Sequence, residues 1–257
     1  MKKLYIIPDR NNIHESIEIA KKYNAGFEFN DFYSPDILDD ADELNRRLRL
    51  YLSNRQLPEK RTMHGAFYDV LIFSSDRRIR KISEYRIDQS LEVANLIGAS
   101  SVIFHTNYLP TFYLESYRKT WIDMNTYFWA EQCVKHPELN IYIENMFDIS
   151  PELLYKLAKS LESIPNFGVC FDYAHASLAR LPLEEWSSQL SSYVRHLHIN
   201  DNDLKSDLHL AVGDGKIDWK LFSEQYKKYF SECSLLIETT GIDKISRSID
   251  FIQHLNL

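Results

Sequence analysis

The sequence predicts a single closed barrel of eight parallel strands, each followed by a helix. Short apolar segments alternate with longer amphipathic segments along all 257 residues. This alternation implies parallel strands joined by right-handed helical crossovers. Eight such units in about 250 residues are typical of the (β/α)₈ or TIM barrel. No linker rich in proline, glycine or serine divides the chain, so we expect one domain over residues 1–257. An open, doubly wound sheet is the alternative.

The first half of the chain contains four predicted strand and helix pairs. Pro8 ends the first strand, and Gly98 is a natural C-terminal stop for the third helix. The second helix is rich in charged residues and the fourth in aromatic ones. The predicted strands are residues 3–8, 25–29, 61–65 and 101–105, and the predicted helices are residues 13–23, 39–54, 78–97 and 114–135.

The second half repeats the pattern four times. Ser150, Pro151 and Glu152 form a favourable helix start, because a capping serine precedes proline at the first helical position. The predicted strands are residues 140–145, 167–172, 194–199 and 234–238, and the predicted helices are residues 151–160, 183–193, 219–230 and 243–254.

The composition limits the classes of function. With 44% hydrophobic and 26% charged residues, the chain has the composition of an ordinary globular protein. A formal net charge of -7 does not favour nucleic acid or an anionic membrane as the partner. The three cysteines lie far apart, which argues against a disulfide scaffold and fits a cytoplasmic location. The apolar run before Pro8 is too short for a signal peptide or a membrane span.

Metal-ligand residue types follow the predicted strands at their carboxyl ends. The reactive residues of such a barrel lie at these ends and in the loops after them, so the side chains should meet at one rim. The seventh loop adds a D-x-H pair, whose spacing directs both side chains of an extended segment to the same side. The nine candidates are His64, His105, Glu144, Asp172, His175, His198, Asp207, His209 and Glu238.

Four of these residues form the predicted inner metal site: Glu144, Asp172, His198 and Glu238. Carboxylate oxygens combined with one imidazole suit Mn²⁺, Zn²⁺, Co²⁺ or Mg²⁺ better than a metal that prefers thiolates. Carboxylates clustered without a cation would repel one another and raise one another's pKa. A bound divalent metal removes this conflict.

Other polar and aromatic residues receive different interpretations. His196 has the same inward parity as His198, and we expect it to fill the barrel interior rather than to support the metal. His14, His136 and His254 fall on helices or loops that face solvent. The candidate substrate-binding residues are Lys205, which is the only cation just after His198, together with Tyr68, Trp219 and Glu28.

Four motifs in this order resemble the xylose isomerase-like TIM-barrel superfamily, which contains sugar phosphate isomerases and epimerases as well as apurinic endonuclease IV. The resemblance covers nearly the whole chain. The motifs are D-x-x-H at Asp172 to His175, H-x-x-D at His198 to Asp201, D-x-H followed by G-x-G-x-I from Asp207 to Ile217, and I-E-T at Glu238.

The resemblance to the epimerase branch implies one divalent metal in the inner site. Glu144 and Glu238 would then also serve as the paired acid and base, and His175 would contact the substrate. A metal that bridges a carbonyl and its neighbouring hydroxyl acidifies the C–H between them, so carboxylates can move the proton. We expect an isomerase or epimerase of a small sugar or sugar phosphate.

The resemblance to the endonuclease branch implies the alternative, a phosphoesterase with two or three zinc ions. His64, His105, His175, Asp207 and His209 would then join the inner set as ligands. The segments after the second and third strands carry few lysines or arginines, although a protein that binds DNA needs cations along the phosphate path. We therefore expect a small-molecule partner rather than nucleic acid. The aromatic fourth helix is either buried or the interface of a homodimer.

Overall fold

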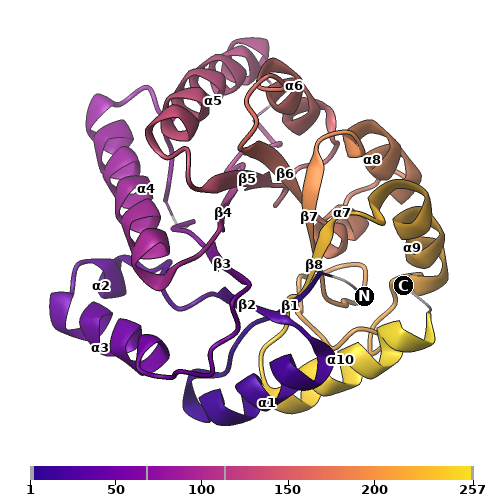
Figure 1. The fold of residues 1–257 in the computed structure, drawn as a ribbon. Coiled ribbons are helices and arrows are strands. Elements are labelled where there is room, and N and C mark those ends of the chain that lie inside the picture. The colour runs from indigo at the N-terminus through magenta and orange to yellow at the C-terminus, as the bar shows by residue number, and fades with distance from the viewer. Residues whose placement is uncertain (1–2, 68, 113, 256–257) are drawn as a thin grey trace.

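The computed structural model describes residues 3–67, 69–112 and 114–255, and within them the strands form a closed parallel barrel (Figure 1). Each strand pairs with the next, and β8 pairs with β1, so the predicted closed barrel is confirmed and the open sheet is excluded. The strands are β1 (Leu4–Ile6), β2 (Gly26–Phe29), β3 (Arg61–His64), β4 (Ser101–His105), β5 (Asn140–Glu144), β6 (Phe167–Asp172), β7 (Val194–Ile199) and β8 (Ser234–Ile237).

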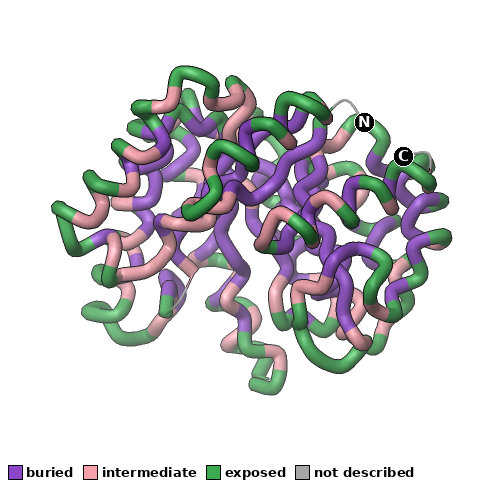
Figure 2. The backbone as a smooth tube through the Cα atoms, turned by 90° about the horizontal axis from the view of Figure 1, so that it is seen from below, coloured by how far each residue is buried: buried purple, intermediate pink, exposed green. Residues whose placement is uncertain are grey.

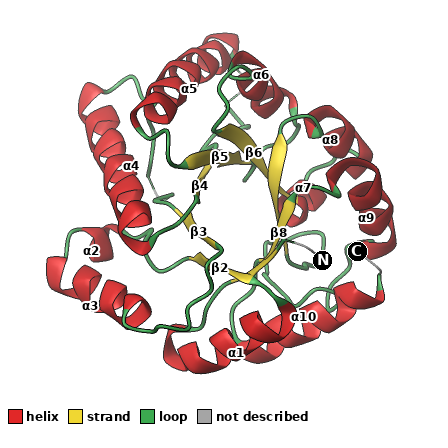
Figure 3. Cartoon of the chain, in the orientation of Figure 1, coloured by secondary structure: helices red, strands yellow, loops and turns green. Residues whose placement is uncertain are grey.

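The helices surround the barrel in a ring (Figure 3). Most of them match the predicted ranges, but the short helices α2 and α7 fall in segments that were expected to be loops. Helices of four and six residues are too short to show a helical hydrophobic period. The helices are α1 (Ile13–Tyr23), α2 (Pro35–Leu38), α3 (Ala41–Leu52), α4 (Arg77–Ile97), α5 (Glu115–Lys135), α6 (Glu152–Ser160), α7 (Tyr173–Leu178), α8 (Leu183–Leu190), α9 (Trp219–Gln225) and α10 (Ile242–His254).

One helix end follows its predicted sequence signal and another does not. Gly98 ends α4 in the left-handed conformation with φ 69°, as its position predicts. The cap predicted at Ser150 does not form, because α6 starts one residue later than expected and Pro151 occupies its N-cap without a side-chain hydrogen bond. The predicted helix 219–230 consists of α9 and a π-helical turn at Tyr226–Phe230.

The core lies between the barrel and the inner faces of the helices (Figure 2). Helix α5 shows why aromatic residues are concentrated there. Trp121, Phe128 and Trp129 are buried, and the ring of Trp129 packs against Phe104 of β4 with the centroids 5.1 Å apart, whereas Tyr127 is 74% exposed. Packing against the barrel therefore accounts for Trp121, Phe128 and Trp129, but not for Tyr127. Within the described residues, no helix is long and apolar enough to cross a membrane.

The long loop between β7 and α9 is organised around the buried carboxylate of Asp201. This carboxylate accepts hydrogen bonds from the backbone N–H groups of Asn202, Gly213 and Ile217 and from the indole N–H of Trp219. A Cβ atom at Gly215 would lie 2.3 Å from the Asp201 carboxylate, so only glycine fits at this position. The H-x-x-D and G-x-G-x-I motifs thus form one structural unit that holds the D-x-H segment at the rim.

Replacing Asp201 by Ala is expected to lower the free energy of unfolding by on the order of 4 kcal/mol, because several buried donors would lose their acceptor. Urea denaturation of the metal-free protein measures this change. Asp203→Ala is the matched control, since its carboxylate accepts hydrogen bonds from the exposed N–H groups of Lys205 and Ser206 rather than from buried donors. Equal destabilisation by the two substitutions would contradict the structural role of Asp201.

Candidate metal centre

The nine predicted ligand residues converge at the mouth of the barrel formed by the carboxyl ends of the strands. The strand register contributes directly, because parallel pairing sets His105 beside Glu144 and Asp172 beside His198. His175 lies on α7, the short helix whose N-cap is Asp172, and the Asp172 carboxylate accepts a hydrogen bond of 2.6 Å from the backbone N–H of His175. Asp207 and His209 extend from the β7–α9 loop and are partly exposed, whereas the other seven residues are buried.

The nine side chains form three groups, and within each group the potential ligand atoms all lie within 4.8 Å of one another. The predicted inner site forms one of these groups. Glu144 belongs to two groups, so it connects the inner site with the adjacent pair of histidines. The groups are Glu144, Asp172, His198 and Glu238; His64, His105 and Glu144; and His175, Asp207 and His209.

Distances between donor atoms test whether these groups fit metal ions. Ligand atoms about 2.0–2.1 Å from a tetrahedral ion are separated by about 3.4 Å. The Nε2 atoms of His64 and His105 are 3.3 Å apart. In the other two groups, His198 Nδ1 lies 3.3 Å from Glu144 Oε2, and His175 Nε2 lies 3.4 Å from Asp207 Oδ2. One pair in each group therefore has the spacing of two atoms that share an ion.

The orientation of three imidazole rings also fits metal binding. His64 Nδ1 lies 3.0 Å from the carbonyl oxygen of Gly65, His175 Nδ1 lies 2.9 Å from that of Asn145, and His209 Nδ1 lies 2.9 Å from that of Glu238. A carbonyl can only accept, so each Nδ1–H donates to it. In the neutral ring, Nε2 then carries the lone pair that faces the site.

Buried carboxylate oxygens that accept no hydrogen bond are the second test of fit. Within the described residues, both oxygens of Glu144 and Oδ2 of Asp172 are buried without a hydrogen-bond donor. Buried carboxylates are normally hydrogen-bonded, paired with a charge or coordinated to a metal. The combination of carboxylate and imidazole donors fits Zn²⁺, Mn²⁺ or Co²⁺.

The pKa values of the centre show how its charges balance without a cation. Burial, together with the nearby carboxylates of Glu238 and Glu144, raises the pKa of Asp172 well above its usual value. Burial opposes the charged form of His209, but the carboxylates of Asp207 and Glu238 raise its pKa to about 10. Protons on imidazoles therefore neutralise part of the carboxylate charge, and a metal ion would have to displace them.

Zinc binding at about pH 8 is expected to release about one proton from His209, because the pKa near 10 keeps this ring protonated before the metal arrives. Calorimetric titration in two buffers of different ionisation enthalpy measures the number of protons. His209→Ala should release at least about one proton fewer than the unsubstituted protein, because the His209 proton is absent and the emptied group no longer displaces a proton from His175, whose pKa is also raised. An unchanged proton count in that variant would contradict the charge state described for His209.

A cavity of about 510 Å³ opens above the three groups. Its walls are largely apolar or uncharged, and among the described lining residues there is no lysine or arginine. The rings of Tyr33 and Phe67 pack together with centroids 4.8 Å apart, while Phe147 is 59% exposed. Besides side chains of the three groups, the cavity is lined by Ile7, Asn30, Tyr33, Phe67, Met146, Phe147, Thr239 and Thr240.

Three of the four predicted substrate-binding residues, Lys205, Trp219 and Glu28, lie away from the cavity. Lys205 is exposed on the β7–α9 loop and does not line the cavity. The indole of Trp219 is buried against Asp201, and Glu28 is fully buried inside the barrel. Tyr68 lies outside the described residues. Sequence reasoning missed Tyr33, Met146 and Phe147, because a loop residue carries no periodic signal that shows which way it faces.

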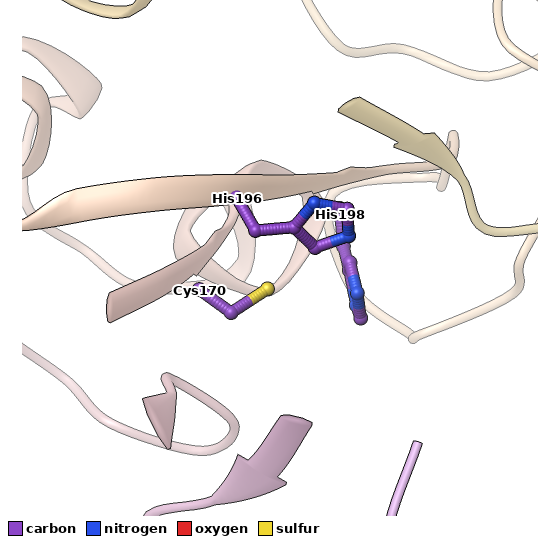
Figure 4. Close-up of side chains that lie close together, drawn as sticks. All are labelled: Cys170, His196 and His198. Atoms are coloured by element: carbon purple, nitrogen blue, oxygen red, sulfur yellow. The ribbon is translucent and has the colours of Figure 1, made fainter. Parts of the chain in front are cut away.

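A second polar layer lies inside the barrel next to the inner group. His196 fills the interior, as predicted, with Nδ1 2.6 Å from Ser234 Oγ and Nε2 3.1 Å from Glu28 Oε2. Figure 4 shows the thiol of Cys170 beside the rings of His196 and His198 on the adjacent strand. Burial raises the pKa of Cys170 well above its usual value, so this side chain is a neutral thiol.

Comparisons with known proteins agree with this architecture. A family model described as xylose isomerase-like TIM barrel matches residues 17–255, which confirms the predicted resemblance. Two proteins of Methanocaldococcus jannaschii, both named as uncharacterized, are 27% identical to this chain over 202 residues. MJ1311 is matched over 74% of this chain and 68% of its own length, and MJ1614 over 76% and 77%.

Solved structures share the fold over almost the whole chain. A D-tagatose 3-epimerase-like protein is 22% identical with a TM-score of 0.77, covering 98% of this chain and 96% of that chain. The TTHB071 protein of Thermus thermophilus, soaked with ZnCl₂, is 22% identical with a TM-score of 0.72 and coverages of 99% and 98%. Endonuclease IV of the same organism is 15% identical with a TM-score of 0.63 and covers 98% of both chains. At these identities, the similarity establishes the fold alone.

Proposed function

The chain belongs to the xylose isomerase-like TIM-barrel family, and we propose that it hydrolyses phosphate esters of small molecules with the help of several divalent metal ions. One observation carries this proposal: the nine ligand-type side chains form three groups, two of which share Glu144. Metal-assisted proton transfer requires only the inner group. Five further ligand-type residues at metal-binding distances are expected for a phosphoesterase and are unnecessary for an isomerase.

The proposed roles follow from the position of each residue. Glu144, Asp172, His198 and Glu238 would hold one ion; His64 and His105 would hold a second together with Glu144; and His175, Asp207 and His209 would hold a third. When bound, divalent ions neutralise phosphate oxygens and lower the pKa of a water nucleophile. The backbone carbonyls that accept from the three Nδ1–H groups keep the rings oriented, which reduces reorganisation during the reaction.

The cavity supports a small substrate rather than duplex DNA. A DNA-binding surface needs several lysines or arginines to neutralise phosphates, and the described lining of this cavity contains neither. The aromatic side chains of Tyr33, Phe67 and Phe147 provide apolar surface for the organic part of the substrate. A phosphorylated small molecule, such as a sugar phosphate, would place its phosphate at the metal groups and its remaining part against these walls.

Isomerisation or epimerisation of a sugar is the second candidate function. The observation that favours it is the inner group itself, which is fully assembled and contains the two carboxylates of Glu144 and Glu238. With a single ion there, these carboxylates could remove and return a proton next to a carbonyl. Under this alternative, the other two groups would have no role in the reaction.

Metal content and product analysis distinguish the two reactions. We expect about three ions per chain after loading with Zn²⁺ or Mn²⁺, and release of inorganic phosphate from a panel of sugar phosphates. The same samples are tested with ketohexoses for epimerisation and with an oligonucleotide that contains an abasic site for strand cleavage. One ion per chain, together with epimerisation and no phosphate release, would overturn the proposal. Cleavage of the oligonucleotide alone would overturn the small-molecule assignment.

A further inference from the structure

We infer that Glu28 fixes the orientation of His198 and thereby controls how tightly the inner group holds its metal ion. This inference rests on the metal centre of the proposed function and does not depend on the reaction. It assigns Glu28, which was expected to bind substrate, as a positioning residue. Its side chain is fully buried and does not line the cavity, so it cannot contact a substrate bound there.

The ring of His198 lies between Glu28 and the inner group. Glu28 Oε1 is 2.9 Å from Nε2 of His198. On the other side of the same ring, Nδ1 lies 3.3 Å from Glu144 Oε2 and 3.5 Å from Glu238 Oε1. The two atoms are not aligned as a hydrogen bond, but a carboxylate has no proton to donate, so its negative charge at 2.9 Å favours the ring form with the proton on Nε2. This leaves Nδ1 as the atom that would bind the metal.

The carboxylate of Glu28 is itself held in place from two other strands, the adjacent β3 and the more distant β7. The Thr62 hydroxyl of β3 donates to Glu28 Oε2 over 2.6 Å. Nε2 of His196, on β7, lies 3.1 Å from the same oxygen, and Ser234 of β8 contacts the other nitrogen of that ring. Glu28 therefore cannot rotate away from His198 without breaking these contacts. A histidine ligand that donates its other N–H to a fixed carboxylate is oriented and made more basic.

The adjacent side chains of Cys170, His196 and His198 also lie close enough to hold a metal (Figure 4). The hydrogen-bond partners decide between a metal site and a supporting layer. Both nitrogens of His196 contact protein groups, and Nε2 of His198 contacts Glu28. A metal at Cys170 would have to break one of these contacts. The layer is therefore organised to support His198 rather than to bind another ion.

Zinc affinity tests this role when the inner group is examined alone. The starting protein for this test is the double variant His105→Ala and His209→Ala, which lacks one ligand of each of the other two groups. In this background, Glu28→Gln is expected to weaken Zn²⁺ binding about 10- to 100-fold, as measured by competition with a chromophoric chelator. Gln has nearly the same shape as Glu but lacks its negative charge. Thr62→Val, which loosens Glu28 without removing it, should weaken binding less but in the same direction.

Asp148→Asn is the matched control, because Asp148 is also a buried carboxylate that accepts a 2.6 Å hydrogen bond from a threonine, Thr106. It should change zinc affinity less than about 3-fold, since its contacts among the described residues are with Thr106 and Met146 and not with His198. Unchanged affinity in Glu28→Gln, or an equal loss in Asp148→Asn, would overturn the inference.

A second readout does not require bound zinc. If the double variant His105→Ala and His209→Ala binds no zinc, that result counts against the proposed function and leaves the role of Glu28 to be tested by this readout. Proton NMR of the metal-free protein should show an Nε2–H signal of His198 that is shifted downfield by the Glu28 carboxylate 2.9 Å away. This signal should move upfield in Glu28→Gln and stay in place in Asp148→Asn. An unchanged signal in Glu28→Gln would show that Glu28 does not hold His198.

Discussion

Replacing Glu144 by Gln is expected to abolish phosphate release, with turnover at least about 1000-fold lower than in the original protein. Glu144 belongs to both the inner group and the group of His64 and His105, and its carboxylate lies 3.3 to 3.5 Å from three imidazole nitrogens. The neutral amide of Gln is a much poorer ligand, so two ions should be lost together. Elemental analysis and phosphate release measure the two effects.

Glu152→Gln provides the control for this substitution. Glu152 lies on α6 at the surface, where it pairs with Arg118 and Lys156. An exposed ion pair contributes little to stability, so this variant should keep its metal content and turnover. Circular dichroism should show that both variants are folded. Full metal content and normal turnover in Glu144→Gln would refute the shared-ligand assignment.

Truncating one histidine in either of the two groups other than the inner group is expected to remove one ion from the centre. His105→Ala should empty the group that His105 forms with His64 and Glu144, and His209→Ala should empty the group with His175 and Asp207. Each variant should bind about one ion fewer and release phosphate at least about 100-fold more slowly, because each ion neutralises charge in the reaction. The inner ion should remain bound in both variants.

Thermal unfolding gives an independent measurement of the same loss. A ligand that binds only the folded state raises the melting temperature, so zinc should stabilise each variant less than it stabilises the original protein. His254→Ala is the control, because His254 is at the exposed end of α10 and belongs to none of the three groups. If His105→Ala and His209→Ala left turnover unchanged, hydrolysis by several ions would be excluded, and the single-ion isomerase would become the better explanation.

Much of the fold is encoded in local patterns. The predicted strands 101–105, 167–172 and 194–199 coincide with β4, β6 and β7. A buried strand of a parallel barrel is a short apolar run between amphipathic helices, which makes it visible in the sequence. The short helix α7 was missed because one and a half turns show no period. As a result, the sequence placed His175 at the rim without showing the helix that holds it.

The inventory of candidate ligands could also be derived from sequence, because strand ends in a (β/α)₈ barrel point to one rim. The sequence does not show which of these side chains are in contact. Glu28 and His196 are 168 residues apart, yet their side chains are in contact. Trp219 was expected at the substrate, but its N–H is required by Asp201, which lies 18 residues earlier.

The sequence by itself therefore determined the barrel, its strand ends and the nine ligand-type residues, since each depends on residue type and local spacing. The tertiary structure alone decided how these nine divide into three groups, that Glu144 is shared, and that Glu28 lies inside the barrel rather than in the cavity. The physical reason is that strand register and barrel closure set distances between side chains that are remote in sequence, and these distances determine which side chains are able to share an ion.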